Sequence, residues 1–113
     1  MKRNQRRVAR LVGGLTVCAA LGVLGVSARA QGAGAATYKT KCAACHGPDG
    51  KGDTSIGKTN KIRNLGSADV QKQSDAELTT IIADGKGKMP AYGKSLKADQ
   101  VKELVAFLRS LKS

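Results

Sequence analysis

The chain has few aromatic side chains and only one histidine. Its 113 residues contain no tryptophan, two tyrosines and one phenylalanine. The chain is strongly basic, with a formal net charge of +12. A nucleic-acid-binding protein would also need arginine clusters, aromatic platforms or a groove-entering motif. Because none is visible in residues 31–113, nucleic acid is excluded as a partner. No alternating apolar pattern of useful length occurs either, so no β-strands are expected.

The first thirty residues have the pattern of a secretory signal. An apolar run at residues 11–26 is followed by Ala28-Arg29-Ala30, after which cleavage is expected. The run is short for a membrane span and contains four glycines. We therefore expect no stable membrane insertion after cleavage, with an uncleaved anchor as the alternative. The basic residues that precede the run are Lys2, Arg3, Arg6, Arg7 and Arg10.

Cleavage would divide the chain into a signal peptide at residues 1–30 and one small exported domain at residues 31–113. Cys18 lies within the apolar run, and we interpret it as an apolar filler of the signal. The signal holds six basic and no acidic residues, so its removal lowers the formal net charge from +12 to +6. The 12 lysines and 2 arginines that remain favour steering of a partner over bidentate recognition.

One motif carries most of the chemical information, Cys42-Ala43-Ala44-Cys45-His46. Two thiols three positions apart, followed at once by a histidine, are typical of a c-type haem attachment site. Both sulfurs would form thioethers with the vinyl groups of the porphyrin, and His46 would supply the proximal axial ligand of the iron. A large apolar cofactor would also compensate for the thin aromatic core of so small a domain.

Four other interpretations of the motif stay open, and the simplest is an accidental match. A zinc site needs four ligands, and the only further cysteine, Cys18, lies in the signal. A thioredoxin-like dithiol usually comes with a βαβ pattern, which the sequence lacks. In an oxidising compartment Cys42 and Cys45 could also form a simple disulfide, and locally only the adjacent His46 argues against it.

The segment around the motif is expected to be a helix followed by a loop. The helix covers about residues 33–45, and Gly47 and Pro48 stop it. Residues 47–64 are dense in glycine and polar residues, so we expect a long loop that wraps something other than its own side chains.

Two further helices are expected in the second half of the chain. The first spans residues 75–84 and begins with a capping box formed by Ser74 and Glu77. The second covers about residues 98–111 and has the strongest amphipathic pattern, although Lys97 is a poor N-cap.

Met89 is the candidate for the second axial ligand of the iron. It is the only methionine after the initiator and lies in a loop at residues 85–93, rich in glycine and lysine. A lone methionine ordinarily fills a gap in a core, but the glycines and Pro90 make a core helix or strand implausible here. Because a thioether favours ferrous iron, ligation by His46 and Met89 predicts a relatively high reduction potential.

With both ligands placed, residues 31–113 resemble a small bacterial class I cytochrome c, which carries a single haem. The resemblance rests on the haem-binding run at residues 45–52, the methionine loop at residues 88–92, and Gly34 and Tyr38 in the first helix. It implies an all-α fold with helices packed around one covalently bound haem c, attached through the two cysteines of the motif, Cys42 and Cys45.

The resemblance also assigns roles outside the motif. Gly34 would let the C-terminal helix cross closely, and Phe107 would pack onto that crossing. Many members of the family have a proline where this chain has Lys58, and the carbonyl of that proline accepts the N–H of the proximal imidazole. The acceptor for His46 is therefore left open by the sequence.

The function implied is a periplasmic carrier of single electrons and not an enzyme, because both axial positions of the iron are filled. Its lysines would steer it toward redox proteins with acidic docking patches, and we expect a monomer. One alternative is a membrane-tethered cytochrome c subunit of a larger respiratory oxidase or dehydrogenase complex. Another is an open-site haem enzyme or sensor in which Met89 does not bind. The lysines are Lys39, Lys41, Lys51, Lys86, Lys88 and Lys94.

Overall fold

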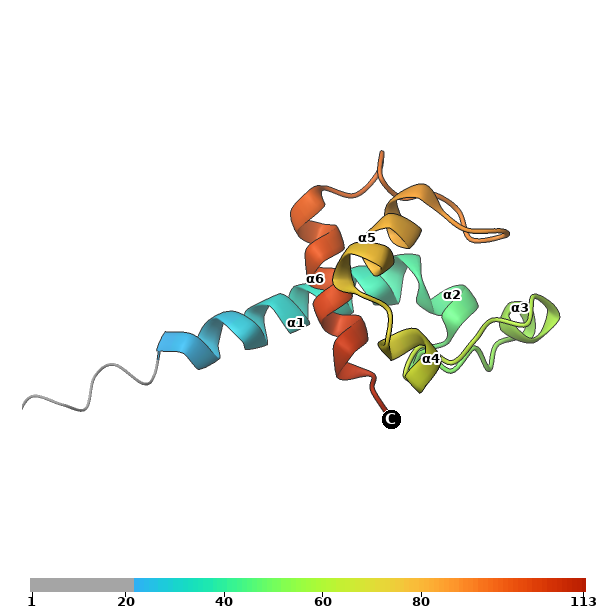
Figure 1. The fold of residues 1–113 in the computed structure, drawn as a ribbon, viewed down its shortest axis with the longest axis horizontal. Helices are drawn as coiled ribbons and strands as arrows, with labels where there is room; N and C mark the ends of the chain where they lie inside the picture. Colours follow the sequence, from blue (N-terminus) through green and yellow to red (C-terminus); the bar gives the residue numbers. More distant parts are fainter. Residues whose placement is uncertain (1–21) are drawn as a thin grey trace, which may run out of the picture.

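The computed structural model describes residues 22–113, which are helical (Figure 1). Cys18 and most of the expected signal lie outside the described residues. Within this range no β-strand forms, and residues 86 and 89 make one isolated bridge. The helices are α1 (Gly22–Lys41), α2 (Ala43–His46), α3 (Ser55–Thr59), α4 (Ala68–Gln71), α5 (Asp75–Asp84) and α6 (Ala98–Ser110). The all-α expectation is confirmed.

The crossing of α1 and α6 is the most extensive contact between helices (Figure 1). It is close because Gly34 has no side chain, and a Cβ at that position would overlap the backbone carbonyl of Glu103. One turn further along α1, the ring of Tyr38 packs against Phe107 with a centroid distance of 4.9 Å and an interplanar angle of 47°. The roles expected for Gly34 and Phe107 are therefore confirmed.

The hydrophobic core lies where α1, α5 and α6 meet, and α6 supplies the largest share. Leu104 is the most deeply buried side chain, with 1% of its surface exposed. Burial of an aliphatic side chain of this size contributes about 1.5–3 kcal/mol relative to an exposed one. The buried hydrophobic residues are Tyr38, Val70, Leu78, Ile82, Leu96, Val101, Leu104, Val105 and Leu108.

The two C-terminal helices form as their sequence patterns predict. Helix α5 begins after Ser74, whose hydroxyl accepts from the N–H of Glu77 while the Glu77 carboxylate accepts from the N–H of Ser74. Helix α6 ends at Ser110, one residue before the predicted end. Its N-cap Lys97 makes no side-chain cap, but its N–H donates to Oε1 of Gln100, which partly compensates.

The predicted boundaries of the first helix were wrong. Helix α1 begins at Gly22 rather than near residue 33, because small and apolar residues without a proline continue the helix toward the N-terminus. It ends at Lys41, and a separate turn, α2, follows Cys42 and stops at Gly47, which has a φ of 82°. The motif therefore lies on a break between two helices.

The expected loop at residues 47–64 contains the short helix α3, which the sequence analysis missed. Thr54 caps this helix, since its Oγ1 accepts from the N–H of Gly57 at 2.8 Å. The same hydroxyl donates to the carbonyl of Cys45 at 2.8 Å. A Cβ at Gly57 would overlap the carbonyl of Gly52 and crowd that of Cys45, so α3 packs directly on the attachment motif.

We predict that Gly34→Ala lowers the free energy of unfolding by about 1–3 kcal/mol, because the new methyl group would force α1 away from α6. Gly32→Ala is the matched control, since a Cβ at Gly32 meets nothing within 4 Å. Denaturant unfolding of the haem-containing protein measures both. Equal stability of the two variants would contradict the account of the crossing.

Candidate functional site

The two motif cysteines lie at the junction of α1 and α2, and both are half-buried free thiols. The N–H of Cys42 donates to the carbonyl of Tyr38, and the carbonyl of Cys42 accepts from the N–H groups of Cys45 and His46. Burial, followed by repulsion from Cys45, raises the pKa of the Cys42 thiol to about 11. The thiol is therefore protonated at neutral pH.

His46 ends α2 with its ring partly enclosed. Burial lowers the pKa of the imidazole, so the ring is neutral and has a lone pair free at neutral pH. Its Nδ1 is buried and has no hydrogen-bond partner among residues 22–113. A buried, unpartnered ring nitrogen is costly in an apolar surrounding. The sequence left the acceptor for the His46 N–H open, and among residues 22–113 neither Lys58 nor any other residue accepts a hydrogen bond from Nδ1.

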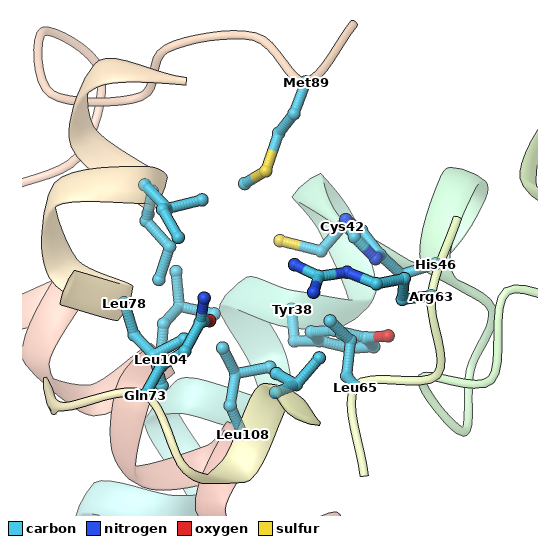
Figure 2. A pocket seen from close by; sticks show the side chains of 13 residues that line it. Tyr38, Cys42, His46, Arg63, Leu65, Gln73, Leu78, Met89, Leu104 and Leu108 are labelled. Atoms are coloured by element: carbon cyan, nitrogen blue, oxygen red, sulfur yellow. The ribbon is translucent and has the colours of Figure 1, made fainter. Parts of the chain in front are cut away.

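An apolar cleft of about 660 Å³, including its open mouth, lies beside the motif. Its floor is formed by core residues of α5 and α6, among them Leu78, Leu104 and Leu108. Figure 2 shows the sulfur of Cys42 directed into the cleft, with His46 at one side. The lining residues are Tyr38, Cys42, His46, Arg63, Leu65, Val70, Gln73, Leu78, Ile81, Ile82, Met89, Leu104 and Leu108.

Met89 reaches the same cleft from a hairpin between α5 and α6. Its half-buried side chain packs against the core, and Figure 2 shows its thioether pointing into the cleft from a different side than His46. The structure therefore brings three of the four predicted site residues, Cys42, His46 and Met89, to one cleft. Cys45 is half-buried but is not among the residues that line it.

Two polar residues that the sequence analysis missed also line this cleft, Arg63 and Gln73. In Figure 2 the guanidinium of Arg63 extends into the cleft beside Cys42. A sequence signal for it existed, because Arg63 is one of only two arginines against 12 lysines in residues 31–113. An arginine in such a chain indicates a site where a planar, multidentate donor is needed.

The donor set and shape of this cleft fit a haem. The walls are mostly apolar, as a porphyrin requires, and a neutral imidazole and a thioether enter from different sides. The Nδ1 of His46 makes no hydrogen bond with the described residues. Residues 22–113 include no group of three or more His, Cys, Asp or Glu side chains arranged to hold a metal ion.

Comparison with known proteins assigns the chain to a family. The family described as cytochrome c oxidase, cbb3-type, subunit III, matches residues 29–108. The chain belongs to the cytochrome c family. Family membership implies covalently attached haem c, and Cys42 and Cys45 have the CxxCH spacing of its attachment site.

Relatives of this cytochrome c domain fall into two groups. Cytochrome c6 of Aphanizomenon flos-aquae is 35% identical over 78 residues, which cover 66% of this chain and 83% of the relative. The cbb3-type cytochrome c oxidase subunit FixP of Azorhizobium caulinodans is 32% identical over 79 residues, and the match spans only 26% of that subunit.

A solved structure has the same fold as this cytochrome c domain. The KustC0563 c-type cytochrome superimposes with a TM-score of 0.66 and 32% sequence identity, and the match covers 71% of this chain and 98% of that chain. Within residues 22–113, no helix has both the length and the apolar character needed to cross a membrane.

Tyr38 generates a pH-dependent prediction. Its buried hydroxyl donates to the carbonyl of Gly47 at 2.7 Å, directly after the motif. Burial, followed by Cys42 and Asp49, raises the pKa of Tyr38 to about 12. Because this value lies above that of the unfolded chain, the stability contributed by the phenol is intact below about pH 10 and is lost as the pH rises toward 12.

Tyr38→Phe should therefore lower the free energy of unfolding by about 0.5–1.5 kcal/mol at neutral pH, since the hydrogen bond to Gly47 is lost. Between pH 10 and 12 its stability should fall less steeply than that of the wild type. Denaturant unfolding at a series of pH values tests both effects. Parallel pH profiles would contradict the role of the buried phenol.

Proposed function

We propose that this chain carries single electrons through one haem c, attached at Cys42 and Cys45 and ligated by His46 and Met89. The observation that carries the proposal is the placement of Met89, whose thioether points into the cleft beside the attachment motif (Figure 2). A bound haem supplies a one-electron iron couple, and a histidine and methionine pair raises its potential relative to two histidines. With both His46 and Met89 bound to the iron, no position would be left for a substrate, which supports a carrier rather than an enzyme.

The remaining cleft residues have distinct parts in holding the cofactor. His46 is neutral, as a ligand must be, because burial lowers its pKa. Arg63 and Gln73 are hydrogen-bond donors in an otherwise largely apolar lining, and they suit the carboxylate groups of a haem. The leucines of the floor would keep water away from a bound haem, which would support a high potential.

Partners of this carrier are redox proteins with acidic docking patches. Six lysines lie close in sequence to Cys42 or to Met89, and all six are exposed. Such a distribution of positive charge steers an acidic partner toward the cleft. Because salt screens this attraction, the association rate should fall as the ionic strength rises. The lysines are Lys39, Lys41, Lys51, Lys86, Lys88 and Lys94.

We predict that Met89→Ala lowers the reduction potential, abolishes the far-red charge-transfer band of the oxidised protein and opens the iron to cyanide. Met89→His is the control, because the new histidine should restore a sixth ligand and keep cyanide out, while the reduction potential of the haem stays low. A redox titration followed by visible spectroscopy measures the potential and the band. A wild-type protein that is high-spin and binds cyanide freely would favour the open-site enzyme or sensor.

Export and cleavage after Ala30 belong to the same proposal. Gln31, Gly32 and Ala33 are exposed, and the first residue of α1 known to be buried is Gly34, so cleavage would leave the α1–α6 crossing intact. The match to subunit III of a cbb3-type oxidase favours a second candidate, a membrane-tethered subunit of a larger complex that keeps its N-terminal segment.

Intact-mass measurement of the protein from an exporting host separates these two candidates. We predict a mass that lacks residues 1–30 and includes one haem, as expected for a soluble periplasmic carrier. The full-length mass plus one haem, recovered with the membrane fraction, would instead support the tethered subunit.

A further inference from the structure

The loop that carries Met89 is a tight hairpin. The N–H of Lys86 donates to the carbonyl of Met89 at 3.2 Å, and the N–H of Met89 donates to the carbonyl of Lys86 at 3.0 Å. Gly85 has a φ of 76°, and a Cβ there would crowd the carbonyl of Met89. Because the hairpin is internally fixed, the position of the Met89 sulfur depends on where the hairpin as a whole is held.

The backbone anchors of this hairpin hold it only to its own side of the cleft. The N–H of Tyr92 donates to the carbonyl of Ile82 at 3.0 Å, and the N–H of Gly93 donates to that of Ala83 at 2.9 Å. Both acceptors belong to α5, the helix that precedes the hairpin in sequence. These bonds do not reach the elements that carry Cys42 and His46.

The hydroxyl of Tyr92 does reach across, to a residue 51 positions earlier in the chain. It donates to the carbonyl of Lys41 at 3.1 Å, at the last residue of α1 and next to Cys42. This carbonyl is available because α1 breaks there, and the N–H of Cys45, four residues on, donates to Cys42 instead. The break in the helix thus creates the acceptor that Tyr92 uses.

A second hydrogen bond crosses from the tip of the hairpin to α3. The Nζ of Lys88 donates to Oδ1 of Asn60 at 3.0 Å, and Asn60 is the half-buried C-cap of α3. In Figure 1 the segment after α5 extends on the same side of the molecule as α3. Since Thr54 ties α3 to the carbonyl of Cys45, this bond links the hairpin indirectly, through α3, to the attachment motif.

We propose that Tyr92 and Asn60 are positioning residues that hold the Met89 hairpin closed over the cleft. Each connects the hairpin to one end of the attachment motif, Tyr92 through Lys41 beside Cys42, and Asn60 through α3 beside Cys45. Neither side chain touches the iron. The inference rests on the proposed function, in which Met89 is the sixth ligand.

Cyanide binding to the oxidised holoprotein tests this proposal, because cyanide reaches the iron only when Met89 leaves. Tyr92→Phe removes one hydroxyl and keeps the ring, and Asn60→Ala removes the acceptor for Lys88. Loss of one hydrogen bond should raise the cyanide-binding rate about two- to tenfold in each variant, and the effects should multiply in the double variant. Asn60→Asp keeps an acceptor for Lys88 and should bind cyanide no faster than the wild type.

Ser95→Ala and Thr59→Ala are the matched controls. Each removes an exposed hydroxyl close to one of the two positioning residues. The Ser95 hydroxyl donates to the carbonyl of Tyr92, and the Thr59 hydroxyl donates to the carbonyl of Ser55. Both should bind cyanide at the wild-type rate. Denaturant unfolding should show that Tyr92→Phe and Asn60→Ala are not globally destabilised in proportion to their faster cyanide binding.

The outcomes distinguish this proposal from the proposed function. If the wild type excludes cyanide and the two positioning variants do so equally well, the positioning roles are wrong and the ligation by Met89 stands. If the wild type binds cyanide as fast as Met89→Ala, the ligation itself is wrong. A cyanide rate that rises only in step with global unfolding would also overturn the positioning roles.

Discussion

The close crossing of α1 and α6 at Gly34 is the constraint on which the rest of the structure depends. A side chain at this position would meet the backbone of Glu103, so the two helices approach each other only because none is present. The crossing brings the end of α1, with Cys42, over the buried face of α6 that forms part of the cleft floor. The distance between the attachment point and the floor is thereby set by two backbones rather than by flexible side chains.

The helices that follow from local sequence signals could be predicted closely. The bounds of α5 are those expected from Ser74 and Glu77, because a capping box is a contact within one turn. The amphipathic pattern of α6 likewise identifies its buried face. Helix α3 could not be found in this way, since its five residues carry little periodicity and its position depends on the carbonyl of Cys45, which the sequence does not reveal.

The residues of the candidate site could be predicted where they belong to a local motif with a known chemical use, or where their residue type is rare in the chain. The motif cysteines and His46 are adjacent in sequence, and Met89 stood out as the only methionine after the initiator. Arg63 was missed because its place in the cleft depends on how the chain turns between α3 and α4. The hydrogen bond from Tyr92 to Lys41 joins residues 51 positions apart, so no local sequence pattern predicts it.

The burial of Cys42 has a consequence for the order in which this protein is made. Thioether formation requires a nucleophilic thiolate, and folding raises the pKa of the Cys42 thiol to about 11. A chain that closed its helices first would offer its cofactor a protonated sulfur inside a half-closed cleft. Attachment is therefore favoured while the chain is still open, because a larger fraction of the Cys42 thiol is ionised there.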